Sequence, residues 1–379
     1  MSNNKNFVVK NGLQAGRYLL SGGTETAGSE GYSLGAASYD SVSFSVASQD
    51  TTPYGITFKS DGTKMYVVGD AGDDVNEYSL STAWDVSTAS YTTVFSVASQ
   101  TTIPMDIHFK TDGTSFYISD RATEDIFQYD MTTAWDISTA SYTSKSYAQA
   151  QSTNISGLTF NNTGSKMYIS DITGSAVYQY TLSTAWDVST ASYDSVSLSI
   201  SEGDTTAFTM TFNDDGTKLF TLDNSESVFQ YNLTSVYDLS TASYSGTSYA
   251  LTQGGTLNFG IAFKSDGSKM YVSSSTGDSV YQYSTVSLTQ TLDLSTGTTF
   301  SFTPSGATTV SFTNPPASGI AVGFSVEING DGSAITWPTS VKWPSGVAPT
   351  ATASKEVYAF VTTDGGTSYY GKLAGSDIA

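Results

Sequence analysis

A tandem repeat of about 51 residues organises most of this chain. The segment at residues 58–66, Phe-Lys-Ser-Asp-Gly-Thr-Lys-Met-Tyr, returns four more times with a glycine turn in the same place. The turn glycines are Gly62, Gly113, Gly164, Gly216 and Gly267, so the steps between units are 51, 51, 52 and 51 residues. Spacing this regular is typical of repeat architectures such as propellers and solenoids.

Two further markers keep the same period. The sequence Ala-Trp-Asp places a tryptophan once per unit, and Ala-Ser-Tyr recurs before the last β-like run of each unit. These markers are Trp84, Trp135 and Trp186 with Tyr237 in the fourth place, and Tyr39, Tyr91, Tyr142, Tyr193 and Tyr244. An aromatic residue that recurs in every unit indicates a scaffold role, packing the loop between the third and fourth strands, rather than one binding site.

Each unit predicts four short strands. Asp61-Gly62 lies between two β-rich runs and predicts a tight hairpin, since glycine tolerates the positive φ that such a turn needs. The strands expected in the first unit cover residues 56–58, 65–68, 75–80 and 92–97. The run 65–68 is apolar on both faces and should be buried between layers, whereas 42–46 alternates valine or phenylalanine with serine and should be half exposed.

Buried inner strands and a half-exposed outer strand describe a blade of a β-propeller. The fifth unit, residues 259–283, has only three strand-like runs, and an unpaired fourth-strand sequence, residues 39–46, precedes the first unit. We therefore predict an all-β, five-bladed propeller over residues 36–286, closed by an N-terminal strand. Closure removes exposed strand edges. An open solenoid is the alternative, although neither end carries a capping sequence.

The flanking segments leave the repeat. Residues 1–35 are rich in glycine, serine and asparagine, are too short to bury a core alone, and are expected to dock on a partner or oligomerise. Residues 287–379 contain strand-like alternations at 299–303, 308–312, 322–328 and 357–362, so a β-sandwich-like C-terminal domain is predicted.

Composition excludes several kinds of function. The net charge is −20, which repels nucleic-acid phosphate and anionic membranes, so we expect neither as a partner and no membrane insertion. The chain contains no cysteine and one histidine, which rules out disulfides, thiolate nucleophiles and paired-histidine metal motifs. We expect no cofactor and no metal. No secretory signal is recognised at the start of the sequence, so export by the common pathway is not expected.

Three parts of the sequence resemble bacteriophage proteins. Phe-Val-Val-Lys-Asn-Gly-Leu at residues 7–13 is similar to the openings of tail-fibre-like proteins of marine phages. The stretches 335–344, Ile-Thr-Trp-Pro-Thr-Ser-Val-Lys-Trp-Pro, and 360–375 resemble the terminal domain of many phage tail fibres, and the repeat resembles propeller repeats of virion proteins.

This resemblance implies a non-enzymatic virion structural protein, a tail fibre or spike for host attachment, assembled in the host cytoplasm. The expected partners are other virion proteins, through the N-terminal segment, and a glycan or protein of the host surface. A homotrimer is the expected assembly. A capsid decoration protein or head fibre is the alternative, and a polysaccharide depolymerase is a third possibility.

Catalytic side chains are scarce where a propeller enzyme needs them. Glycosidases use a pair of carboxylates, but the residues that precede the apolar core of each inner strand include one acid: Gly55, Asp106, Gly157, Thr209 and Gly260. Loop acids such as Asp50, Glu202 and Asp204 could still reach an axial cleft. His108 replaces a threonine or alanine found in the other units, and we interpret it as a tolerated substitution rather than an axial ligand or base. We therefore predict no enzymatic activity and no catalytic residues.

Two other sets of residues could bind a ligand. The acidic turn at residues 69–74 could hold calcium, although a solvated turn is the simpler interpretation because no regular ligand pattern is present. Trp337, Trp343, Tyr369 and Tyr370 in the C-terminal domain could contact a glycan or receptor, since aromatic rings stack on sugars and are common at binding hot spots. The alternative for these four is a place in the core or at a subunit interface.

Overall fold

The computed structural model describes residues 20–21, 24–27, 31–200, 206–223, 225–255, 257–286, 288–304, 308–330, 332 and 334–376. The chain divides into two compact units, one of residues 29–286 and the other of residues 1–28 and 287–379. These boundaries differ from the predicted 1–35, 36–286 and 287–379, because part of the N-terminal region belongs to each unit. The segment 7–13 lies outside the described residues, so its docking role stays a prediction.

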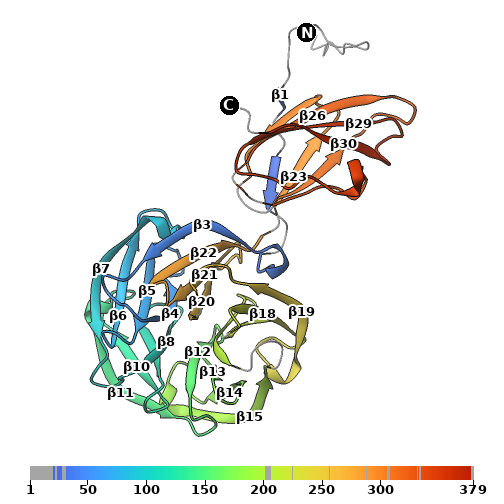
Figure 1. Ribbon diagram of the computed structural model, residues 1–379. Helices are drawn as coiled ribbons and strands as arrows, with labels where there is room; N and C mark the ends of the chain where they lie inside the picture. The colour runs from blue at the N-terminus through green and yellow to red at the C-terminus, as the bar shows by residue number, and fades with distance from the viewer. Residues whose placement is uncertain are drawn as a thin grey trace, which may run out of the picture. The chain divides into compact units, whose positions relative to one another are not determined.

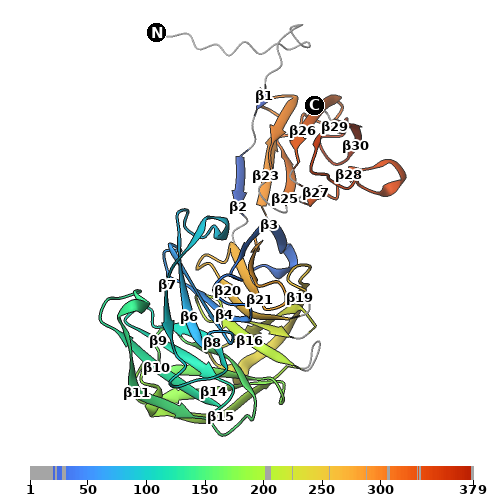
Figure 2. The ribbon, with the colours of Figure 1, turned by 60° about the vertical axis from the view of Figure 1, so that its left-hand side comes forward.

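The unit formed by the two chain ends holds two β-sheets around one apolar core. The sheet orders are β1-β24-β26-β29-β30-β28 and β2-β23-β25-β27 (Figure 2). The strands are β1 (Leu20–Ser21), β2 (Thr24–Ala27), β23 (Leu288–Asp293), β24 (Thr299–Phe302), β25 (Thr308–Thr313), β26 (Val322–Asn329), β27 (Ile335–Thr336), β28 (Val341–Lys342), β29 (Lys355–Thr362) and β30 (Tyr369–Gly375).

Strands β23 to β26 alternate between these two sheets, so that β23 pairs in parallel with β25 and β24 pairs in parallel with β26. Leu292, Phe300, Val310 and Phe324, one from each strand, meet in the core. The four strands expected from the sequence are confirmed, while β23, β30, β1 and β2 were not foreseen. The structure therefore establishes two mixed sheets with a shared core, and a sandwich-like class for this unit stays a prediction.

Residues 29–286 form a five-bladed propeller of four-stranded antiparallel blades (Figure 1). The first four blades are β4 (Pro53–Phe58) to β7 (Ala89–Ser96), β8 (Pro104–Phe109) to β11 (Ala140–Ala148), β12 (Ile155–Phe160) to β15 (Ala191–Ser199) and β16 (Ala207–Phe212) to β19 (Ala242–Ala250). Their middle strands are β5 (Lys64–Gly69), β6 (Asp74–Leu80), β9 (Ser115–Asp120), β10 (Asp125–Met131), β13 (Lys166–Asp171), β14 (Ala176–Leu182), β17 (Lys218–Asp223) and β18 (Ser227–Leu233). The fifth blade comprises β20 (Asn258–Phe263), β21 (Lys269–Ser274), β22 (Ser279–Ser284) and β3 (Ser38–Ser45).

The predicted closure by the N-terminal strand is confirmed. Strand β3 pairs antiparallel with β22, so that Ser43 lies opposite Tyr281 and Phe44 opposite Val280. Met65 to Gly69 in β5 are all buried, whereas Ser41, Ser43 and Ser45 of β3 are exposed between partly buried residues, as the alternation indicated. The turn glycines Gly62, Gly113, Gly164, Gly216 and Gly267 all have φ between 66° and 72°, which explains why glycine persists where Thr163 replaces the turn aspartate.

Tyr32 completes the aromatic series in the fifth blade. The residues at this position have φ between 57° and 68°, a left-handed conformation that is rare for bulky side chains, and each ring lies against its blade's turn glycine. The series is Trp84, Trp135, Trp186, Tyr237 and Tyr32, and their glycines are Gly62, Gly113, Gly164, Gly216 and Gly267. The scaffold interpretation of the tryptophans agrees with this packing, and the propeller sequence begins before residue 36.

Tyrosine hydroxyls connect neighbouring blades to these aromatic positions. In four of the five blades, the tyrosine of the second strand donates a hydrogen bond to the main-chain carbonyl of the aromatic residue of an adjacent blade. The bonds are Tyr66 to Trp135 (2.8 Å), Tyr117 to Trp186 (2.7 Å), Tyr168 to Tyr237 (2.5 Å) and Tyr271 to Trp84 (2.6 Å). At the remaining boundary, between the fourth and fifth blades, Phe220 takes the tyrosine's place beside Tyr32 and has no hydroxyl to donate.

This boundary yields a stability prediction. Phe220→Tyr should add the missing bond to the carbonyl of Tyr32 and raise the free energy of unfolding by about 1 kcal/mol, the usual net value of such a bond. The control is Phe116→Tyr. The equivalent residues of the other blades are Met65, Met167, Leu219 and Met270, none of which has a hydroxyl, so the repeat provides no hydrogen-bond acceptor for one there. Urea unfolding should show stabilisation for the first variant and destabilisation for the second. Equal destabilisation of both would contradict the role of the hydroxyls.

Candidate functional site

The candidate site lies where the five inner strands β4, β8, β12, β16 and β20 surround the propeller axis (Figure 1). Tyr54, Met105, Phe208 and Phe259, from four of these strands, form one buried cluster. The ring centroids of Tyr54 and Phe259 are 4.6 Å apart, and those of Phe208 and Phe259 are 4.5 Å apart. The cluster therefore joins four of the five inner strands through apolar contacts.

The next residue of each inner strand forms a tightly packed layer. A Cβ atom at Gly55, Gly157 or Gly260 would come within 2.5–2.7 Å of main-chain atoms of the adjacent strand, so these positions accept only glycine. Asp106 and Thr209 are the two exceptions in the layer. The Asp106 carboxylate accepts hydrogen bonds from the main-chain nitrogens of Ile107 (2.9 Å) and Leu158 (3.0 Å) and from Thr209 Oγ1 (2.9 Å).

Asp106 is therefore a structural carboxylate in its present surroundings. Its side chain is buried, and burial raises its pKa to about 7 although all three hydrogen bonds lower it. Both oxygens already accept bonds from the protein. Asp214 is the other carboxylate that lines the pocket, but it is exposed at the rim, beyond the end of β16. The two acids lie at opposite depths, which is not the side-by-side arrangement that glycoside hydrolysis requires.

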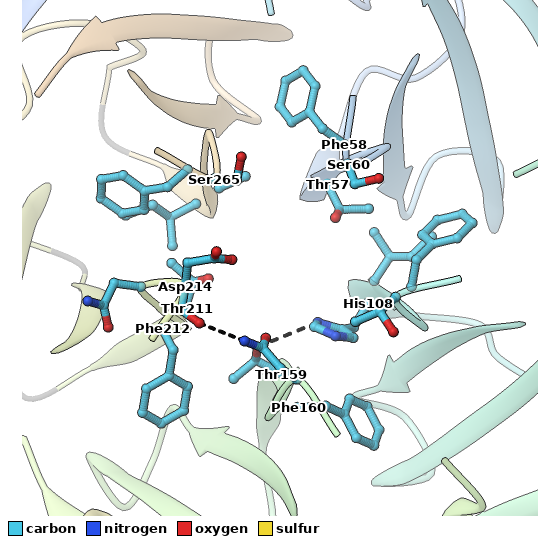
Figure 3. Close-up of a pocket in the computed structure, with 18 of the residues that line it drawn as sticks. Thr57, Phe58, Ser60, His108, Thr159, Phe160, Thr211, Phe212, Asp214 and Ser265 are labelled. Atoms are coloured by element: carbon cyan, nitrogen blue, oxygen red, sulfur yellow. Dashed lines mark hydrogen bonds between the residues drawn. The ribbon is translucent and has the colours of Figure 1, made fainter. Parts of the chain in front are cut away.

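Above this layer the axis opens into a pocket of about 230 Å³ (Figure 3). Two rings of side chains, all polar except one alanine, line it, one from the inner strands and one from the loops that follow them. The inner ring is Thr57, His108, Thr159, Thr211 and Ala262, and the rim is Ser60, Thr111, Asn162, Asp214 and Ser265. Aromatic residues such as Phe58, Phe160 and Trp186 form the walls. Among the described residues that line the pocket there is no lysine or arginine.

Three lysines next to the lining residues form ion pairs with aspartates of the hairpin turns. Lys59, Lys110 and Lys264 pair with the turn aspartates Asp61, Asp112 and Asp266 at 2.7–2.9 Å. The lysine lowers the pKa of each aspartate. These ion pairs fix the positive charges at the turns, and the pocket itself offers hydroxyls, amides, an imidazole and aromatic faces.

His108 lies in the inner ring of the pocket, at the position that Thr57, Thr159 and Thr211 hold in other blades, and its interpretation as a tolerated substitution stays a prediction. Its ring is 5.2 Å from that of Phe160 and 6.2 Å from that of Trp186, and Nδ1 lies 3.5 Å from Thr159 Oγ1 (Figure 3). Burial lowers its pKa to about 4, so the imidazole is neutral near pH 7. A neutral imidazole offers one donor and one acceptor.

Hydrogen bonds hold the rim together across the third, fourth and fifth blades. Asn162 Nδ2 donates to the Asp214 carbonyl (2.6 Å), and the Asp214 nitrogen donates to the Tyr32 hydroxyl (3.2 Å). The Tyr32 hydroxyl in turn donates to the Ser265 carbonyl (2.8 Å). Tyr32, which precedes β3, therefore links the rim residues of the fourth and fifth blades.

The four aromatic candidates of the C-terminal domain differ in how far their side chains are buried. Trp337 and Tyr369 are buried in the core of that unit, and Trp343 packs against it. These three rings are therefore part of the core, which is the alternative that the sequence left open. Trp337 and Tyr369 are too buried to stack on a sugar. Tyr370 is 58% exposed and remains a candidate contact.

Asp50 and Asp74, beside and within the acidic turn, each accept a hydrogen bond from the protein. Asp50 is buried and accepts a bond from the Thr52 nitrogen, and burial raises the pKa of Asp74 to about 6. No group of three metal-binding side chains occurs within the described ranges. Glu202 and Asp204 lie outside them.

No helix among the described residues is long and apolar enough to cross a membrane.

Comparisons with known proteins add little to this site. No protein family matches the sequence, and no curated protein matches it. A solved structure of a functionally unknown protein from Desulfotomaculum acetoxidans is 13% identical with a TM-score of 0.39, covering 59% of this chain and 62% of that one. A Bacteroides uniformis protein provisionally named a 6-phosphogluconolactonase is 12% identical with a TM-score of 0.39, covering 58% and 63%. This chain spans less than two thirds of those proteins, and such values carry no argument about function.

The buried carboxylate yields a pH prediction. The pKa of Asp106 rises from an ordinary value of 3.8 to about 7 on folding, so its contribution to stability is fully present below pH 4 and is lost as the pH rises through 7. Asp106→Asn removes this titration. The free energy of unfolding of the variant, relative to wild type, should therefore increase by up to about 4 kcal/mol between pH 4 and pH 8.

Urea unfolding of both proteins at pH 4, 5, 6, 7 and 8 measures this difference. Asp215→Asn serves as the control, because that carboxylate is exposed and its pKa is lowered by Thr217. A difference between Asp106→Asn and wild type that does not change with pH would show that Asp106 is already ionised throughout.

Proposed function

We propose that this protein is a non-enzymatic structural protein of a bacteriophage virion, a tail fibre or spike, and that its propeller presents the axial pocket to a glycan on the host surface. The pocket carries the binding part of this proposal. It lies among the five inner strands and is lined mainly by hydroxyls, amides, an imidazole and aromatic walls, with the exposed carboxylate of Asp214 at the rim. The uncharged groups bind hydroxyls without the cost of removing water from a charge.

The arrangement of acids favours binding over hydrolysis. Asp106 is committed to three hydrogen bonds inside the protein, and Asp214 is at the exposed rim. A glycosidase needs one carboxyl group as the acid and a second beside it as nucleophile or base. The pocket therefore supports recognition of a sugar and offers no pair of groups for cleaving one.

The virion part of the proposal is supported by the resemblance of residues 335–344 and 360–375 to phage tail-fibre domains. These residues include β27, β28 and β30 and contribute Trp337 and Tyr369 to a compact core. Attachment to other virion proteins through the N-terminal segment, and assembly as a homotrimer, belong to the same proposal.

An adsorption assay tests the proposed function. Purified full-length protein, added before infection, should bind host cells and reduce adsorption of the phage that encodes it, while releasing no reducing sugar from host polysaccharide. Labelling of particles should place the protein on the tail.

Two results would contradict this function. A location on the head, with no effect of added protein on adsorption, would indicate a capsid decoration protein or head fibre instead. Sugar release that disappears in Asp106→Asn would indicate a depolymerase.

A further inference from the structure

The axial pocket departs from five-fold symmetry at two positions of its inner ring. Thr57, Thr159 and Thr211 present hydroxyls from three blades, His108 presents an imidazole from the second, and Ala262 presents only a methyl group from the fifth. A ring of identical groups would bind a ligand equally well in five orientations. The histidine and the alanine give this pocket a polar side and an apolar side, so a ligand with both kinds of surface has one preferred orientation.

His108 retains hydrogen-bonding capacity for a ligand. Its single protein contact of this kind is the long one from Nδ1 to Thr159 Oγ1, at 3.5 Å, and within the described part of the chain Nε2 has no hydrogen-bond partner. The side chain is partly exposed to the pocket rather than sealed in the core, and it points toward the axis in Figure 3. Polar groups at such a position normally acquire a partner when a ligand excludes water.

Charge restricts which ligands can enter. Asp214 places a carboxylate at the rim, and the described lining residues include no lysine or arginine. The imidazole of His108 is neutral near pH 7 because burial lowers its pKa to about 4. A carboxylate, phosphate or sulfate group would therefore lose its water without gaining an opposite charge, which is costly.

Size sets a further limit. At about 230 Å³ the pocket is smaller than the roughly 300–1,000 Å³ typical of sites for drug-sized ligands. A single ring fits this volume better than an extended oligosaccharide, whose remaining units would lie over the rim residues Ser60, Thr111 and Ser265.

We infer that the pocket holds one neutral sugar unit of a glycan, that His108 orients it through Nε2, and that acidic sugars are excluded. This inference rests on the proposed function, because it names the class of glycan that the same pocket binds. His108 is here a specificity-determining residue, and its neighbours Thr159 and Thr211 supply the adjoining hydroxyls.

The first test compares sugars that differ only in charge. Binding of the full-length protein to the methyl glycosides of glucose, galactose and mannose is measured by titration calorimetry, together with the corresponding uronic acids. At least one neutral glycoside should bind, and the matching uronic acid should bind at least tenfold more weakly.

The second test uses the single histidine of the chain. Because only one imidazole is present, its side-chain NMR signals belong to His108 without further assignment, and they should shift when the neutral glycoside is added. His108→Thr introduces the residue found at this position in three other blades, so the fold should be retained, and affinity should fall about tenfold. Val347→Ser is the control, because Val347 is 70% exposed and belongs to no candidate site, and it should leave affinity unchanged.

The outcomes separate the inference from the function on which it rests. If the wild-type protein binds no glycan of the host surface, the proposed function fails. If it binds a sugar but the imidazole signals do not move, or His108→Thr binds as well as wild type, the role of His108 is wrong. If a uronic acid binds as tightly as the matching glycoside, the neutral-sugar pocket is wrong while glycan attachment stands.

Discussion

The pairing of β3 with β22 is the interaction on which the rest of the propeller depends. Six residue pairs join a strand near the start of the chain to one more than 230 residues later, and Tyr32 just before β3 adds a ring over Gly267 and two hydrogen bonds at the rim. Without this strand the fifth blade would have an unpaired edge. The axial pocket also depends on closure, because all five inner strands contribute to its lining.

Departures from the repeat, rather than the repeat itself, give the pocket its chemistry. Glycine at three of five positions allows the inner strands to approach closely, and Asp106 uses the remaining space to bind main-chain nitrogens of two blades. His108 and Ala262 distinguish blades that are otherwise equivalent. A repeated scaffold can therefore keep its shape while single substitutions at the axis decide what the pocket accepts.

The sequence predicted the propeller well because its signals are local and recur. Glycine turns, strand alternation and the missing fourth strand of the last unit are visible in the residues, and the pairing of Phe44 with Val280 agrees with them. Tyr32 was missed because it ends the sequence Glu-Gly-Tyr, where other units have Thr-Ala-Trp or a close variant. Its seven-residue spacing to Tyr39 nevertheless equals that of Trp84 to Tyr91. Strands β1 and β2 span two and four residues and have no pattern of their own.

The site was harder to predict, since its residues come together only around the axis. His108 looked like a tolerated change because neighbouring residues in the sequence carry no other chemistry, and Trp337 and Tyr369 looked available because aromatic type does not reveal burial.

The most direct test of the account is a cross-link across the closing strand. The chain has no cysteine, so Ser43→Cys with Tyr281→Cys introduces one pair of thiols at directly opposed positions of β3 and β22. Opposed positions of antiparallel strands fall within disulfide range. We predict an intramolecular disulfide in this variant and none when Ser43→Cys is combined with Tyr178→Cys, the equivalent site in the third blade. Failure of the first pair to form, or a disulfide only between two chains, would contradict a ring closed by its own N-terminal strand.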